Sequence, residues 1–224
     1  MRASPGWMLF VLWAAALFCA GSLAAQVRRW LDLPDRRSLA PARGSETAGV
    51  RYAFSRGMDP VYKESVRKHL PTYLAGVSYH LAVGLAVLTL LGSLALAAPP
   101  PDIRVGLLVA IGLGFMAGVG IQVKRWATPY LRAFSTPDDF GANALVDLFL
   151  AGAWAAVLTP AALPAFYLAA AALLAYIPFS KIRHALFFFL ARYYFGVFFG
   201  RRGVLPPSAP GGAPAGADEG RGAR

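Results

Sequence analysis

Residues 163–202 read LPAFYLAAAALLAYIPFSKIRHALFFFLARYYFGVFFGRR, and this stretch decides how the chain folds. Its apolar part, residues 163–199, is much longer than the roughly 20 residues that one bilayer crossing needs. The pattern predicts a membrane-spanning helix over about 163–184 with a helical extension to about residue 200. Pro178 removes one backbone hydrogen bond and can kink this helix. Charged and imidazole side chains follow it, and these are costly inside a membrane without partners.

The composition of the whole chain agrees with a membrane protein. Of 224 residues, 57% are hydrophobic and 15% are charged, at a mean hydropathy of +0.51. Soluble domains carry about 25% charged residues. The net charge of +11 does not indicate nucleic-acid binding, because the basic residues lie between apolar runs. A single cysteine, Cys19, excludes an intrachain disulfide framework and a cysteine-held zinc or iron–sulfur site, so iron–sulfur chemistry must come from a partner.

Five apolar runs predict an all-α integral membrane bundle of five transmembrane helices, which together form one domain over residues 1–202. The predicted spans are about 6–27, 72–98, 104–123, 143–158 and 163–184. The first run also has the three parts of a cleaved signal peptide. An uncleaved helix is favoured, because the run is long and cleavage leaves a strongly basic segment outside the cell.

Charge sets the predicted topology. The polar segment 28–70 holds ten lysines and arginines, and residues 124–143 hold three more. Such loops stay in the cytoplasm, which places the N-terminus outside and the C-terminus in the cytoplasm. The chain is expected in the cell inner (cytoplasmic) membrane. The basic loop 28–70 can contact anionic lipid headgroups or a soluble partner, and DPVYKESVRKHL within it is a candidate amphipathic helix. Residues 203–224, rich in proline, glycine and alanine, are predicted to be disordered.

The chain has three histidines, His69, His80 and His184. His69 lies in the basic run VRKHLP and reads as a solvated or interfacial residue. His80 lies about nine residues beyond Pro71, roughly 13 Å into the membrane at 1.5 Å per residue. His184 falls at a similar depth in the cytoplasmic half of the last span. Two such histidines can clamp one haem iron, although each can instead bond to a neighbouring helix.

Two cations adjoin His184. Lys181 and Arg183 are candidate partners for haem propionates, and snorkelling to lipid phosphates is the alternative. The fourth span carries Asp147, with Asn143 and Asp139 preceding it at helical spacing of four. Proton transfer at a quinone site is conceivable for Asp147, but a carboxylate at the membrane interface is favoured.

The motifs IPFSKIRH, the Arg-Tyr-Tyr tail after it and YHLAVGL in the second span carry a family resemblance. The chain resembles the gamma, cytochrome b subunit of respiratory nitrate reductases and related membrane subunits of sulfite-reduction and heterodisulfide-reductase-like complexes. In two-haem members of that family, further histidines stand at the positions of Leu90 and Phe166. The resemblance therefore implies a single haem b held by His80 and His184, and an absent outer haem.

This resemblance implies electron transfer between the quinone pool (menaquinone or ubiquinone) and a cytoplasmic iron–sulfur partner. The chain is then an electron-transfer subunit of an oxidoreductase rather than a catalytic subunit by itself. The alternative is a haem-free membrane anchor that recruits a soluble enzyme through its basic loops. A small-solute transporter is disfavoured, because the sequence has no inverted repeat.

Overall fold

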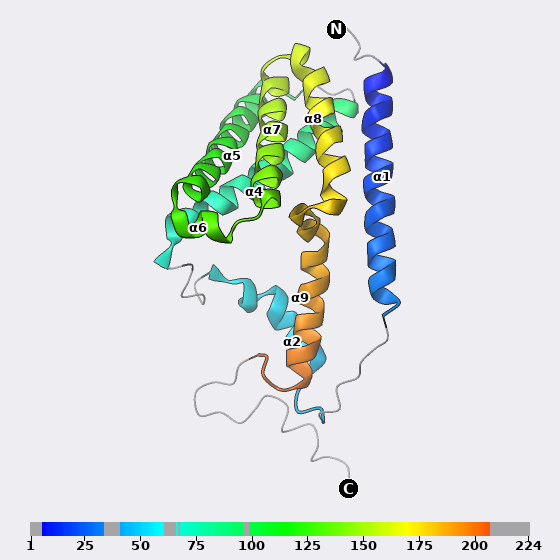
Figure 1. The fold of residues 1–224 in the computed structure, drawn as a ribbon, viewed down its shortest axis with the longest axis vertical. Coiled ribbons are helices and arrows are strands. Elements are labelled where there is room, and N and C mark those ends of the chain that lie inside the picture. The colour runs from blue at the N-terminus through cyan, green and yellow to red at the C-terminus, as the bar shows by residue number, and fades with distance from the viewer. Residues whose placement is uncertain (1–5, 34–40, 61–65, 67, 96–98, 207–224) are drawn as a thin grey trace. The chain divides into compact units, whose positions relative to one another are not determined.

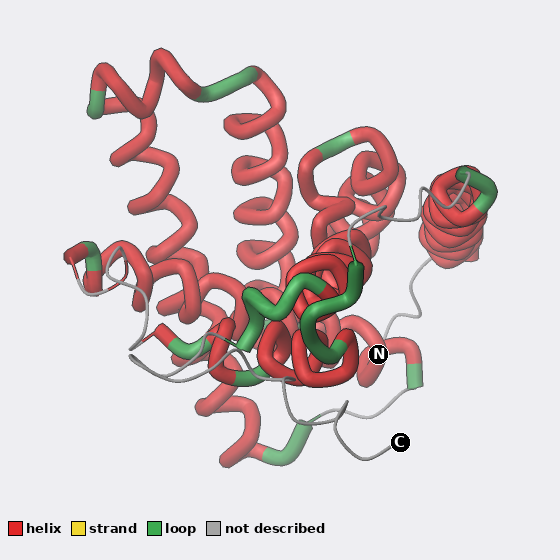
Figure 2. Tube along the Cα trace, turned by 90° about the horizontal axis from the view of Figure 1, so that it is seen from below, coloured by secondary structure: helices red, strands yellow, loops and turns green. Residues whose placement is uncertain are grey.

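A computed structural model describes residues 6–33, 41–60, 66, 68–95 and 99–206 (Figure 1). Every regular element in these residues is a helix, as Figure 2 shows. Five helices are long and apolar enough to cross a membrane, so the predicted all-helical chain with five spanning-length helices is confirmed. The predicted orientation of the termini stays a prediction. The chain divides into two units, Met1–Leu31 with His69–Arg183 and Asp32–Lys68 with His184–Arg224.

The first unit contains the five candidate spans. Its helices are α1 (Gly6–Leu31), α4 (Leu70–Leu94), α5 (Pro101–Ala127), α6 (Pro129–Phe134), α7 (Pro137–Leu158) and α8 (Leu163–Tyr176). Short 3₁₀ helices cover Pro160–Ala162, Ile177–Phe179 and Lys181–Arg183. In Figure 1, α7 lies between α5 and α8, α4 packs against α5 and α7, and α1 runs alongside α8.

Prolines begin two of these helices earlier than the sequence predicted. The third span was expected to begin at about residue 104, but α5 begins at Pro101. Residues 124–143 were expected to form a loop, but α5 continues to Ala127, α6 follows, and α7 begins at Pro137. Proline is tolerated in the first helical turn, because the N–H that it lacks has no intrahelical partner there. A capping box between Thr136 and Asp139 fixes the start of α7.

The helical course over the predicted span 163–184 is not one continuous α-helix. Helix α8 stops at Tyr176, two 3₁₀ turns follow, and a separate helix begins at His184. Ser180 adopts an extended conformation, with φ −101° and ψ 171°. The backbone N–H of Lys181 donates to Asp138 Oδ2 at 2.8 Å instead of to a helical carbonyl. Pro178 has no N–H to continue the helix, and the contact of Lys181 with Asp138 stabilises the non-helical course of the chain after it.

The core of the first unit lies between α4, α5, α7 and α8. Phe149 and Phe166, 2% and 0% exposed, meet there with their ring centroids 5.3 Å apart. Most large apolar side chains of α1, α4 and α5 are exposed instead. Spanning-length helices with apolar outer faces are compatible with contact to a lipid bilayer.

The second unit is built from α2 (Glu46–Phe54), a 3₁₀ turn at Arg56–Met58 and α9 (His184–Arg201). Helix α2 falls within the segment 28–70, which was expected to be a polar connection. The two helices pack through glycines, since a Cβ on Gly49 would overlap the backbone of Gly196 and Gly200. Arg192 Nη2 also donates to Gly57 O at 2.6 Å. The predicted amphipathic helix over 59–70 falls largely on residues 61–65 and 67, and the predicted disordered tail on 207–224, outside the described residues.

Candidate functional site

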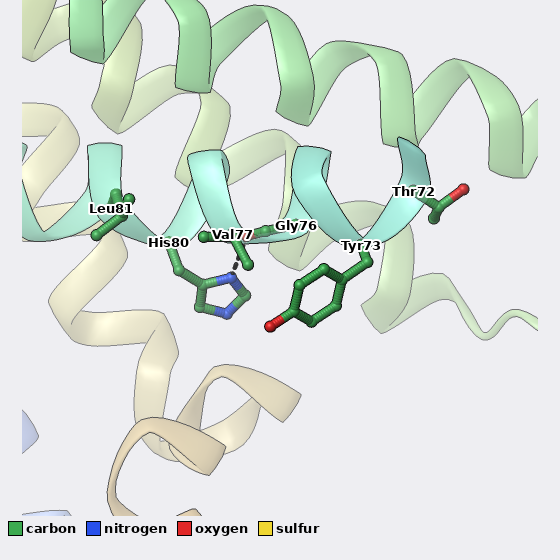
Figure 3. A pocket seen from close by; sticks show the side chains of 6 residues that line it. All are labelled: Thr72, Tyr73, Gly76, Val77, His80 and Leu81. Carbon is green, nitrogen blue, oxygen red and sulfur yellow. Dashed lines mark hydrogen bonds between the residues drawn. The ribbon is translucent and has the colours of Figure 1, made fainter. Parts of the chain in front are cut away.

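His80 stands on the outer face of α4. It is the eleventh residue of the helix and is exposed. Its ring lines an open groove formed entirely by α4, and Figure 3 shows it beside the ring of Tyr73. The groove is lined by Thr72, Tyr73, Gly76, Val77, His80 and Leu81. At 1.5 Å per residue, the histidine lies roughly 15 Å along the helix from its first residue.

A hydrogen bond selects the tautomer of His80. Its Nδ1 lies 2.7 Å from the carbonyl oxygen of Gly76, drawn as a dashed line in Figure 3. A carbonyl only accepts, so Nδ1 carries the proton in this bond and the lone pair resides on Nε2. Metal-ligating histidines donate their second ring N–H in this way, which orients the ring and raises its basicity. The donor set at His80 therefore fits one axial ligand of a haem.

His184 is the first residue of α9 and is also exposed. It belongs to the second unit, whereas His80 belongs to the first, so their pairing on one iron stays a prediction. His69 is the exposed residue at the N-cap of α4, and its side chain makes no capping hydrogen bond. This position agrees with the reading of His69 as a residue at the end of the span.

Lys181 and Arg183 have protein partners in the first unit. Lys181 Nζ forms an ion pair with Asp139 Oδ2 at 2.7 Å. Arg183 Nη1 donates to Gln26 Oε1 at 3.3 Å, and Gln26 Nε2 donates to the carbonyl of Pro178 at 3.0 Å. These contacts tie the break after α8 to α7 and α1. A role for the two cations toward haem propionates stays a prediction.

Sequence reasoning missed the acidic side of this junction. Asp138 accepts from the Tyr176 hydroxyl at 2.5 Å and from the Lys181 backbone N–H. The available signal was TPDD, residues 136–139, which places two carboxylates in the first turn of a helix where the helix dipole favours them. That pattern located a helix start, but nothing in the sequence specified that Lys181 would meet it.

The positions that match the outer-haem histidines of the resembled family belong to the packing. Phe166 is fully buried against Phe149, and Leu90 is partly buried against the same core. Phenylalanine and leucine offer no lone pair to iron. The side chains at these two positions therefore suit helix packing and do not suit ligation.

Asp147, which was expected at the membrane interface, is buried within the first unit. It is 8% exposed and lies among α4, α5 and α7, ten residues beyond Pro137. Its Oδ2 accepts from Asn143 Nδ2 at 2.8 Å. Asn143 Nδ2 also lies 3.3 Å from Gly118 O and from the Tyr79 hydroxyl. The surrounding helices cover this carboxyl group, and its depth relative to the membrane interface stays a prediction.

Within the described residues, no group of three or more His, Cys, Asp or Glu side chains is arranged to hold a metal ion. A haem iron needs only two axial side chains, so the donor requirement of this cofactor is smaller. No known family model, curated protein or solved structure matches the chain.

Proposed function

We propose that the chain is a membrane haem b subunit that transfers electrons between the quinone pool and a cytoplasmic iron–sulfur subunit. The observation that carries this proposal is the His80 imidazole, held by the Gly76 carbonyl on the outer face of an apolar, spanning-length helix. An imidazole at lipid depth is costly to keep there. An oriented ring with its lone pair on Nε2 is suited to iron, and ligation explains why a histidine occupies this face.

The residues have distinct roles in this proposal. His80 and His184 supply the two axial nitrogens, and the Gly76 carbonyl holds the ligating tautomer of His80. Lys181 and Arg183 supply positive charge near the propionates. When bound, the haem supplies the one-electron chemistry, while the protein supplies ligands, orientation and a low dielectric.

The partners follow from the family resemblance and the charge pattern. Menaquinone or ubiquinone is the proposed partner within the bilayer, and an iron–sulfur subunit is the proposed partner on the cytoplasmic side of the inner membrane. The basic segment 28–70 offers an attractive surface for an acidic soluble protein, since exposed positive charge steers association at low salt.

The test is the absorption spectrum of the full chain purified in mild detergent, with haem quantified per chain. We expect one low-spin haem b in the wild type. His80→Ala and His184→Ala should each abolish the low-spin spectrum. His69→Ala is the matched control, because it removes the third histidine at an exposed helix end, and it should leave the spectrum intact.

A second function is favoured by a specific observation. Because Lys181 and Arg183 are engaged with Asp139 and Gln26, the junction can serve the fold of a haem-free anchor that recruits a soluble enzyme. The same preparation separates the two functions. A folded wild type without haem that still retains a soluble partner supports the anchor and refutes the haem proposal. Two haems per chain contradict the count of one.

A further inference from the structure

The carboxyl group of Asp147 is the most deeply placed acid among the described residues of the first unit, at 8% exposed. Asn143 Nδ2 donates to its Oδ2 at 2.8 Å. Its Oδ1 is buried and has no hydrogen-bond partner. Within the described part of the chain, no lysine or arginine forms an ion pair with it. An ionised carboxylate in such surroundings has lost water without gaining a compensating charge.

The other ionisable side chains of the packed helices are engaged elsewhere. On α5, Arg125 Nη1 donates to the Asp139 carbonyl at 2.7 Å. On α7, Asp139 pairs with Lys181, and Asp138 accepts from Tyr176 of α8. Tyr167 of α8 donates to Ser93 of α4. The remaining neighbour is Tyr79 of α4, whose hydroxyl donates to the Asn143 carbonyl oxygen at 3.3 Å and also lies close to the Asp147 carboxyl group. Tyr79 is a neutral phenol, so it brings no positive charge to compensate an ionised Asp147.

Packing around the carboxyl group is tight. A Cβ on Gly118 would overlap both Asp147 Oδ1 and the ring of Tyr79, so the oxygen lies directly against the α5 backbone. A hydrated metal cation has no place there unless side chains move. A proton needs no added volume, and it converts the buried carboxylate into a neutral acid.

We propose that Asp147 is a proton-binding site inside the helical bundle, which holds and exchanges one proton. The step is transfer of one proton from hydronium to the carboxylate, which gives the carboxylic acid and one water molecule, and its reversal. Asn143 and Asp139 precede Asp147 at steps of one helical turn and form a polar line to the start of α7. This line gives protons a route to the carboxyl group. The assignment goes beyond the haem proposal and does not depend on haem.

Infrared spectroscopy of the full chain in lipid nanodiscs tests the proposal. Aspartate labelled with ¹³C at its carboxyl carbon identifies aspartate bands by their isotope shift. At neutral pH we expect a carboxylic-acid C=O band from one aspartate per chain. Asp147→Asn should remove it, and the matched control Asp102→Asn, an exposed acid in the first turn of α5, should retain it. Transfer to D₂O should shift the band to lower wavenumber.

Each outcome decides the matter. A wild type that shows no protonated aspartate at neutral pH overturns the assignment, and this result does not require the Asp147→Asn variant to fold. A band that survives in a folded Asp147→Asn variant also overturns it. A band that never shifts in D₂O shows that the acid does not exchange its proton with solvent, and this result overturns the proposed proton exchange. Haem content has no bearing on these readings, so failure here is distinct from failure of the haem proposal.

Discussion

Lys181 Nζ and Asp139 Oδ2 lie 2.7 Å apart, and this ion pair joins the break after α8 to the first turn of α7. The Lys181 side chain is 56% exposed and that of Asp139 is 18% exposed. Beside it, the Lys181 backbone N–H and the Tyr176 hydroxyl both donate to Asp138. The basic motif IPFSKIRH is therefore also the place where the chain after α8 is fixed to the start of α7.

The ion pair should contribute modestly to stability. A double-mutant cycle with Lys181→Met and Asp139→Asn should give a coupling of about 0.2–1 kcal/mol, because one partner is well exposed and water screens the pair. The measurement is denaturant unfolding of the purified chain in detergent. The control cycle combines Asp139→Asn with Lys124→Met in place of Lys181→Met. Lys124 suits this purpose because its Nζ donates to Thr72 and not to Asp139. Equal coupling in the two cycles contradicts the prediction.

Gly118→Ala should destabilise the bundle. The added Cβ meets Asp147 Oδ1 and the Tyr79 ring, and overpacking of this kind typically costs about 1–3 kcal/mol. Gly120→Ala, on the same helix, is the matched control because a Cβ there meets nothing within 4 Å. Thermal unfolding followed by circular dichroism compares the two variants. The prediction fails if they unfold at the same temperature.

Arg104 should stabilise the C-terminal end of α7. Its Nε donates to Val157 O at 2.9 Å and its Nη2 donates to Leu158 O, so one guanidinium satisfies two carbonyls that the helix leaves open. Arg104→Gln should cost about 1.5–3 kcal/mol, the range for hydrogen bonds to charged groups. Arg104→Lys should restore only part of the lost stability, since the lysine ammonium lacks the planar, two-pronged donor geometry of a guanidinium.

The control for this helix cap is Arg132→Gln. Arg132 makes an exposed hydrogen bond of 3.4 Å to Trp126 O, so its loss should change stability by less than that of Arg104. Unfolding free energies measured in the same detergent give the comparison. A larger loss for Arg132→Gln is the result that refutes the capping role.

The predicted topology can be tested with cysteine labels in a Cys19→Ala background. Asp102→Cys should react with a membrane-impermeant maleimide added to spheroplasts, because the N-terminal end of α5 is predicted to lie outside. Thr47→Cys, exposed on α2, should react only after the membrane is opened. Ser45 is avoided because its side chain caps α2. The reverse labelling pattern means that the chain is inverted.

The sequence by itself determined the helical class, the five spanning-length runs and the separation of basic from apolar segments. These properties follow from hydrophobic length and local composition, which act within a single helix. The three histidines could also be identified from the sequence. The hydrogen bond of His80 Nδ1 to Gly76 O depends only on residues of one helix. The predicted spans began after Pro101 and Pro137, whereas α5 and α7 begin at these prolines, because proline both ends helices and begins them.

Only the tertiary structure decided where the long apolar run divides and how deeply Asp147 is buried. Helix α8 ends at Tyr176, two residues before Pro178, and Asp138 and Asp139, more than thirty residues earlier, hold the chain after the break at Lys181. Asp147 is covered because α4 and α5 meet at Gly118, where the missing side chain allows close approach. Both outcomes depend on which faces of distant helices meet, and hydrophobic periodicity within one helix carries no information about that partner.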